Sequence, residues 1–206
     1  MTKIVGAIGA RLVLRFFAAG KRGKVVGARY TRAMQQITGA RLFEQCHNAS
    51  MKAIASLGIL LLTACTSVQT KIEIEAPAKD VREVLFDFGD YPKWNPFIVK
   101  VDGTVAEGST VMVTVKPVGK NALSGKTTVT SLTSTRLAWT GSLAIPGLFR
   151  GDHEFIIEEQ GPNKTMFYQN EKMSGIIIPF FDFKPEAAGF VLMNESLKKR
   201  AEKSGS

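Results

Sequence analysis

The chain has 206 residues, of which 45% are hydrophobic and 22% charged, a composition that excludes a disordered, collagen-like or polytopic membrane protein. Its two cysteines are too few for a disulfide scaffold or a four-thiolate zinc site. A net charge of +9 suggests at first a nucleic-acid or anionic-membrane partner. Where that charge lies along the chain decides what it means.

The positive charge is confined to the N-terminal quarter of the chain. Residues 1–50 contain nine basic residues and one acid, whereas residues 51–206 contain 18 basic and 17 acidic residues. Because duplex binding rests mainly on neutralised phosphates, the nearly neutral remainder gives no reason to expect a nucleic-acid partner. We interpret residues 1–50 as a basic leader upstream of the true translation start. An organelle transit peptide or a membrane-touching amphipathic helix stays as the alternative.

A second candidate start stands at Met51. Lys52 follows it, then an apolar run over residues 53–62 that is too short to span a bilayer, and then Leu-Thr-Ala-Cys ending at Cys65. This ending resembles the lipobox of bacterial lipoprotein signal peptides, in which the signal is cut before the cysteine and the thiol is acylated. The resemblance implies a signal peptide over residues 51–64, a lipidated Cys65 and a tether over residues 65–69.

The expected location follows from this choice of start. With Met51 as the start, we expect a membrane lipoprotein of the cell envelope, facing the periplasm or the exterior. If the upstream start is used instead, we expect a cytoplasmic protein. A buried helix over residues 53–64, with Cys65 as a packed thiol, is the other interpretation of the segment.

The pattern of residues 70–203 predicts one α+β domain. Alternation predicts a half-buried strand over residues 70–75, and apolar residues at helical spacing predict a helix over 77–88 that ends before Tyr91 and Pro92. Apolar runs separated by glycine- and proline-containing turns predict six further strands, at residues 97–104, 110–117, 127–132, 136–143, 152–159 and 165–174. A last apolar stripe predicts a long helix over 185–203. This order predicts an antiparallel sheet that curves around the terminal helix.

Several motifs resemble the START/Bet v 1-like superfamily (SRPBCC), in its polyketide cyclase/dehydrase branch. They are PAKDV at 77–81, YPKWNPF at 91–97, LAW at 137–139, PGLFRGDHEF at 146–155 and FVLMNESLK at 190–198. The resemblance covers residues 70–203 and implies a helix-grip fold, in which a seven-stranded antiparallel sheet wraps a long C-terminal helix and encloses an apolar cavity. Members include ligand carriers, lipid-transfer domains and cyclases, so the resemblance implies a cavity and leaves the reaction open.

Strand parity indicates which residues face that cavity. If the turn at Gly161-Pro162-Asn163 is symmetric about Pro162, then His153 lies opposite Glu171, Phe155 opposite Gln169, and Ile157 opposite Phe167, all on one face. A slip of one residue would separate these pairs onto opposite faces. Phe180, Phe181 and Phe183 precede the last helix, where they would gate the cavity or pack the helix start. The residues expected to line the cavity are Trp94, Phe97, Trp139, Phe149, His153, Phe155, Phe167, Gln169, Glu171, Met173, Phe183, Phe190 and Met193.

The pair of His153 and Glu171 is the candidate for chemistry. Glu171 could orient His153 and raise its basicity, making the imidazole a general base for cyclisation or dehydration of β-keto compounds. In the competing interpretation the pair, together with Gln169, supplies only polar contacts to an apolar ligand or forms a buried ion pair. The residues alone do not decide between the two.

Three functions are therefore expected, in this order. The first is an anchored domain that binds a small hydrophobic ligand or a lipid, without catalysis. The second is a cyclase/dehydratase with His153 as its base, and the third is lipid transfer or sensing at the membrane. The sequence carries no metal-ligand cluster and no cofactor motif, so we expect neither a metal nor a cofactor. The oligomeric state stays open.

Overall fold

The computed structural model describes residues 64–204 of the chain. The predictions for residues 1–50 and for the signal peptide, apart from Ala64, lie outside the described residues. In chain order the elements are β1 (Ala64–Ile74), α3 (Ala78–Phe86), η2 (Phe88–Asp90), α4 (Tyr91–Trp94), β2 (Ile98–Asp102), β3 (Thr110–Val115), β4 (Leu123–Leu132), β5 (Arg136–Ser142), β6 (Arg150–Gly161), β7 (Lys164–Gly175), η3 (Ile178–Phe180) and α5 (Lys184–Ser204).

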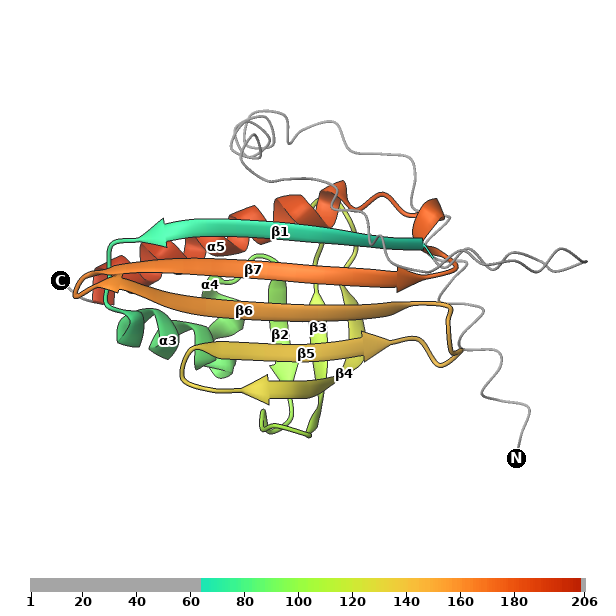
Figure 1. Ribbon diagram of the computed structural model, residues 1–206, viewed down its shortest axis with the longest axis horizontal. Helices are drawn as coiled ribbons and strands as arrows, with labels where there is room; N and C mark the ends of the chain where they lie inside the picture. Colours follow the sequence, from blue (N-terminus) through green and yellow to red (C-terminus); the bar gives the residue numbers. More distant parts are fainter. Residues whose placement is uncertain (1–63, 205–206) are drawn as a thin grey trace, which may run out of the picture.

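The strands form one seven-stranded antiparallel sheet in the order β1-β7-β6-β5-β4-β3-β2. Strands β2 to β7 pair with their neighbours in sequence, whereas β1, the first strand of the chain, pairs with β7, the last. Figure 1 shows that the sheet curves, so that β2 and β3 run across the direction of β6 and β7, with α5 behind β1 and β7. The predicted helix-grip arrangement, a seven-stranded antiparallel sheet curved around a long C-terminal helix, is confirmed. None of the helices within residues 64–204 is long and apolar enough to cross a membrane.

The register of β6 and β7 is the predicted one. His153 lies opposite Glu171, and Phe155 lies opposite Gln169. Burial alternates along both strands, as expected for strands with one face on a core and one face in solvent. The inner face of the sheet, turned toward α5, therefore carries the residues that the turn symmetry placed together.

Residues 65–69, predicted to be a tether, instead form the first half of β1 and pair with β7. Val68 of this segment is buried in the core at 4% exposure. The polar residues that suggested a tether alternate with inward-facing ones, as they do in an edge strand with one solvated side. No spacer therefore separates Cys65 from the sheet.

The helix predicted over residues 77–88 is also shorter than expected. The helix α3 ends at Phe86, and the short elements η2 and α4 follow it. Pro92 was expected to end the helix, but it lies in the first turn of α4, where a missing N–H leaves no hydrogen bond unmade. Asn95 then accepts hydrogen bonds from the backbone N–H groups of Phe97 and Ile98, at 3.0 and 2.9 Å, and turns the chain into β2.

Helix α5 packs against the inner face of the sheet through a close approach at Gly189. A Cβ atom on Gly189 would lie only 2.3 Å from Cδ2 of Phe97, so the absent side chain is what admits the ring. Phe97 and Phe190 meet edge to face, with ring centroids 5.0 Å apart. This contact joins the start of β2 to the middle of the interior.

Candidate functional site

A polar group lies within the apolar interior on neighbouring strands. His153 comes from β6, and Gln169 and Glu171 come from β7. The Nδ1 atom of His153 is 3.5 Å from Oε2 of Glu171, and its Nε2 atom is 3.3 Å from Nε2 of Gln169. His153 and Gln169 are buried, whereas the Glu171 side chain keeps 19% of its surface exposed. The structure therefore brings the predicted pair together and adds Gln169 to it.

The orientation of the Gln169 amide decides the tautomer of the imidazole. If the amide N–H of Gln169 donates to Nε2 of His153, that nitrogen is an acceptor and the ring proton lies on Nδ1. Nδ1–H then points to the Glu171 carboxylate. Histidine is thus oriented by a carboxylate on one side, with its basic nitrogen on the side of the interior amide.

Aromatic rings enclose the histidine. The ring centroid of His153 lies 4.6 Å from that of Phe155, 5.0 Å from that of Phe190 and 6.0 Å from that of Trp139. Met193 of α5 contributes its sulfur 3.6 Å from the Gln169 amide nitrogen. The predicted lining residues on β5, β6, β7 and α5 thus pack directly against one another across the inside of the sheet.

One end of the Gln169 amide has no partner in the protein. Gln169 is fully buried, and its Oε1 atom accepts no hydrogen bond from any group of the protein within residues 64–204. Turning the amide over would only exchange which end is unpaired. A buried polar atom without a partner costs about 1–3 kcal/mol, so such an atom needs an explanation.

Glu186, in the first turn of α5, is a site residue that the sequence analysis missed. Its Oε2 atom is buried without a hydrogen-bond partner. Burial raises its pKa to about 7, and the charges of Glu171 and Asp182 act in the same direction, while Lys120 opposes them. An acid in the first turn of a helix is ordinary, so the sequence offered no signal beyond the apolar residues that follow it.

The Glu171 carboxylate lies over Gly151 of the neighbouring strand. A Cβ atom on Gly151 would come within 2.8 Å of Oε1 of Glu171 and 3.4 Å of the Phe149 ring. Phe149 is half-buried and packs against the core, and the same holds for Phe183, which precedes α5. Phe149 therefore lies beside the Glu171 carboxylate, next to Gly151.

Other predicted lining residues take different places. Trp94 packs edge-on against Tyr91, with centroids 5.1 Å apart, and its Nε1 atom is buried without a partner. Phe180 is 74% exposed, whereas the rings of Phe181 and Phe183 stack with centroids 6.1 Å apart. Phe97, Phe167 and Met173 are buried as predicted, in one cluster with the rest of the core.

Asn194 is a second interior polar residue that the sequence analysis did not assign to the site. Its Nδ2 atom donates to Oγ1 of Thr70 at 2.9 Å, and Thr70 donates to the backbone oxygen of Gln169. Its Oδ1 atom is buried without a partner. The group of interior polar residues on β6 and β7 therefore extends to Thr70 on β1 and Asn194 on α5. Among residues 64–204, no three His, Cys, Asp or Glu side chains are placed to hold a metal ion.

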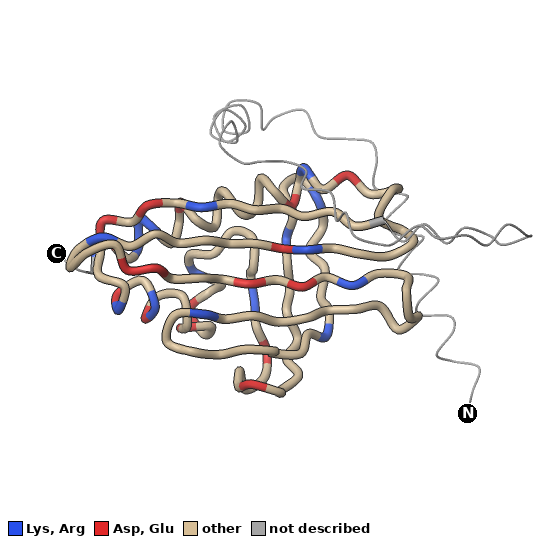
Figure 2. The backbone as a smooth tube through the Cα atoms, in the orientation of Figure 1, with Lys and Arg blue, Asp and Glu red and all other residues tan. Residues whose placement is uncertain are grey.

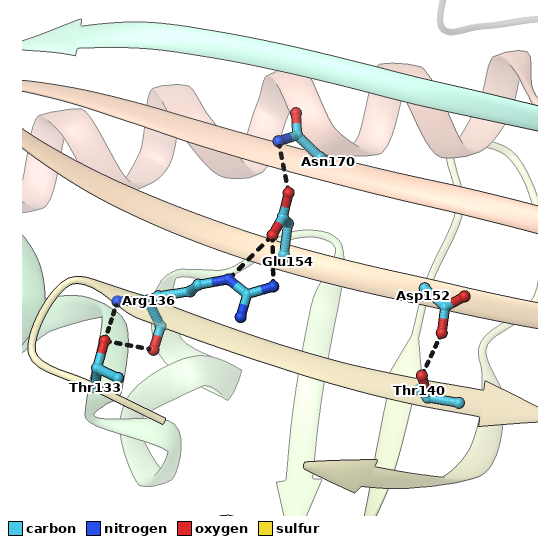
Figure 3. A network of polar contacts seen from close by, with 6 residues as sticks. All are labelled: Thr133, Arg136, Thr140, Asp152, Glu154 and Asn170. Atoms are coloured by element: carbon cyan, nitrogen blue, oxygen red, sulfur yellow. Dashed lines mark hydrogen bonds and ion pairs between the residues drawn. The ribbon is translucent and has the colours of Figure 1, made fainter. Parts of the chain in front are cut away.

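A hollow of about 650 Å³ lies on the outer face of the sheet. Trp139, His153 and Glu171 border it, although the register turns their side chains to the inner face. The two arginines of this hollow, Arg136 and Arg150, pair with the carboxylates of Glu154 and Asp152. Arg136 donates to Glu154, which also accepts from Asn170, as Figure 3 shows. We assign no site here, because a satisfied, charged surface is ordinary for the solvated face of an antiparallel sheet.

Comparison with known proteins places the domain among related folds. A family model described as polyketide cyclase/dehydrase and lipid transport matches residues 66–193. A search of curated protein sequences finds no match.

Solved structures share the fold at low identity. A norcoclaurine synthase mutant from Thalictrum flavum matches with a TM-score of 0.53 and 14% identity, over 70% of this chain and 98% of that one. An aromatase/cyclase from Streptomyces matches with 0.51 and 17%, over 68% and 94%. A hypothetical protein from Helicobacter pylori matches with 0.53 and 15%, over 75% and 99%. At these identities the likeness shows the fold alone.

Proposed function

Because the chain belongs to the polyketide cyclase/dehydrase and lipid transport family, we propose that its domain binds a small, mainly apolar ligand against the inner face of the sheet. The ligand carries one hydrogen-bonding group, which meets Gln169 and His153. The apolar part of the ligand takes the place of contacts that the aromatic and methionine side chains around Gln169 and His153 make with each other. Met173 and Met193 suit this role, since methionine is flexible and fits irregular shapes.

The unpaired Oε1 atom of Gln169 is the observation that carries this proposal. A ligand that donates a hydrogen bond there recovers the cost of the buried atom, which a filled apolar core would never incur. Glu186, whose carboxyl interacts with the charge of Glu171, offers a second unpaired oxygen. The proposed entry lies at Glu171, between the half-buried rings of Phe149 and Phe183, because Glu171 is partly exposed.

Titration with N-phenylnaphthylamine, a neutral fluorescent probe with a single N–H donor, tests this proposal. Gln169→Met keeps the side-chain volume and removes the amide, so probe affinity should fall about fivefold for one lost hydrogen bond. The free energy of unfolding should change little, because the unpaired Oε1 atom is gone while Nε2 of His153 loses its amide partner. Asn170→Leu is the matched control on the outer face. Equal affinity of the parent and Gln169→Met would contradict the proposal.

Catalysis is the second candidate function, and the Nδ1–Oε2 contact favours it. With its Nδ1 proton held toward Glu171, the Nε2 atom of His153 could take a proton from the carbon between two carbonyl groups of a β-keto substrate and return it later. Turnover of such a substrate should vanish in His153→Ala and fall in Glu171→Gln. Unchanged turnover in His153→Ala would exclude His153 as the base.

We also propose that Cys65 carries the lipid anchor of an envelope lipoprotein. The motif before the cysteine supports this location. Cys65→Ala should release the protein from cell membranes into the soluble fraction, and continued membrane association would contradict the lipidation. Mass spectrometry of molecules extracted from the purified protein separates ligand binding from lipid transfer or sensing, which require a membrane lipid as the bound species.

A further inference from the structure

We propose that the end of the domain formed by the β5–β6 and β7–α5 loops is a docking surface that lies on the lipid bilayer. This inference rests on the proposed anchoring of Cys65 and adds the orientation of the domain. Its surface consists of residues 143–149 and 176–181.

The composition of these two loops is the first argument. Neither of the stretches 143–149 and 176–181 contains an ionisable side chain, and both are rich in large apolar residues. Figure 2 shows the corresponding turns at the right-hand end of the molecule without charge, in contrast to the strands behind them. All three large hydrophobic side chains that are exposed within residues 64–204 lie here, with Ile145 at 63%, Ile176 at 41% and Phe180 at 74% exposure. Clustered exposed apolar residues mark an interaction surface.

The two loops form one surface because they are joined. The backbone N–H of Ile176 donates to the oxygen of Gly147 at 3.0 Å, and that of Ile177 donates to the oxygen of Leu148 at 3.3 Å. Gly175 makes this approach possible, with a φ of +138° and only 2.3 Å between a Cβ atom placed on it and the Leu148 oxygen. The exposed side chains are thus carried on a hydrogen-bonded base.

The position at which the chain enters the domain identifies the bilayer as the occupant. Cys65 pairs with Ser174, two residues before Ile176. The start of β1 and both loops therefore lie at the same end of the sheet, on the right of Figure 1. With no spacer after Cys65, an anchored chain must hold this end against the lipid. One acyl chain alone gives marginal membrane binding, so an apolar contact of this kind would strengthen it.

The charges around the surface agree with this orientation. Lys172 and Lys184 are exposed on the elements that flank the β7–α5 loop, with one exposed acid, Asp182, beside them. Lysines next to apolar side chains suit the anionic headgroup region. The proposed ligand entry lies between Phe149, which is part of this surface, and Phe183, two residues beyond it in the chain, so a ligand would pass between the interior and the membrane.

Tryptophan quenching tests the docking surface in the protein purified from cell membranes and reconstituted into phosphatidylethanolamine and phosphatidylglycerol vesicles with brominated acyl chains. Phe180→Trp and Ile145→Trp place the probe on the surface. Asn163→Trp places it in the β6–β7 turn, at the far end of two twelve-residue strands, about 40 Å away. After subtraction of the parent signal, emission from positions 180 and 145 should fall about twofold or more through contact with the acyl chains. Emission from position 163 should not change.

Equal quenching at all three positions, or none at positions 180 and 145, would overturn the docking surface. Shielding of position 180 that depends on protein concentration and not on vesicles would also overturn it and assign the surface to a second copy. Separate experiments test the other two proposals: Cys65→Ala tests the anchor, and probe binding in solution tests the ligand site. Failure of either leaves the quenching result for the docking surface intact.

Discussion

At the scale of single residues, the burial of Glu186 at the start of α5 changes which hydrogen bonds the interior can offer to a ligand. With its pKa raised to about 7, first by burial and then by the charges of Glu171 and Asp182, this carboxyl holds a proton that an exposed carboxyl would have lost. It can then donate a hydrogen bond to a ligand, whereas Gln169 Oε1 accepts one. The interior therefore offers a donor and an acceptor to a bound molecule.

The raised pKa makes stability depend on pH. The folded protein binds the Glu186 proton more tightly than the unfolded chain does, so its free energy of unfolding falls as pH rises from about 4.5 to about 7. Glu186→Gln removes this dependence. Relative to the parent, the variant should gain up to about 3 kcal/mol between about pH 4 and pH 8. Urea unfolding at both pH values measures the gain, with Glu107→Gln in the exposed β2–β3 turn as control.

A gain from Glu186→Gln that is the same at both pH values would show that the carboxyl is not protonated by burial in the folded state. In that case Glu186 would act only as a charged residue at the helix start.

At the scale of elements, the position of α5 depends on Gly189. A glycine inside a helix costs about 1 kcal/mol relative to alanine, so its presence here must be offset by packing. The offset is the Phe97 ring, which occupies the space of the missing side chain and meets Phe190 edge-on. A second contact lies further along the helix, where Arg200 joins Asp90 of η2 and Lys93 pairs with the same carboxylate. The hydrogen bond from Lys93 lowers the pKa of Asp90, opposed by burial and assisted by Arg200.

Gly189→Ala should therefore destabilise the protein despite the higher helix propensity of alanine. The added methyl group overpacks the contact with Phe97, at a cost of about 1–3 kcal/mol. Chemical denaturation measures the change. Combining it with Phe97→Leu should recover part of the loss, because the two positions share one contact. A more stable Gly189→Ala variant would show that the helix can move away from the ring.

The elements also show how far the sequence predicts this structure. The β6–β7 register followed from the turn at Gly161-Pro162-Asn163, because antiparallel pairing makes partner positions a matter of counting. The start of β1 could not be found in this way, since its polar residues gain a strand conformation only from the pairing with β7. Glu186 was missed for a related reason. Its pKa depends on neighbours from β7 and the loop before α5, and local sequence does not show them.

At the scale of the whole molecule, the chain has two different ends. The end with the β5–β6 and β7–α5 loops carries the exposed apolar side chains, the start of β1 and the partly exposed Glu171. The opposite end carries the β6–β7 turn and the C-terminal part of α5 (Figure 1). The proposed anchor, docking surface and ligand entry all lie at the first end. The molecule would therefore turn the entry to its interior toward the membrane.

Native mass spectrometry of the purified full chain tests the central claim, that the interior polar group holds an apolar ligand. The parent protein and the outer-face control Asn170→Leu should carry a bound molecule that organic extraction releases, and Gln169→Met should have lost most of it. A bound molecule that persists equally in Gln169→Met, or a parent that is free of ligand and also fails to bind N-phenylnaphthylamine, would contradict the claim.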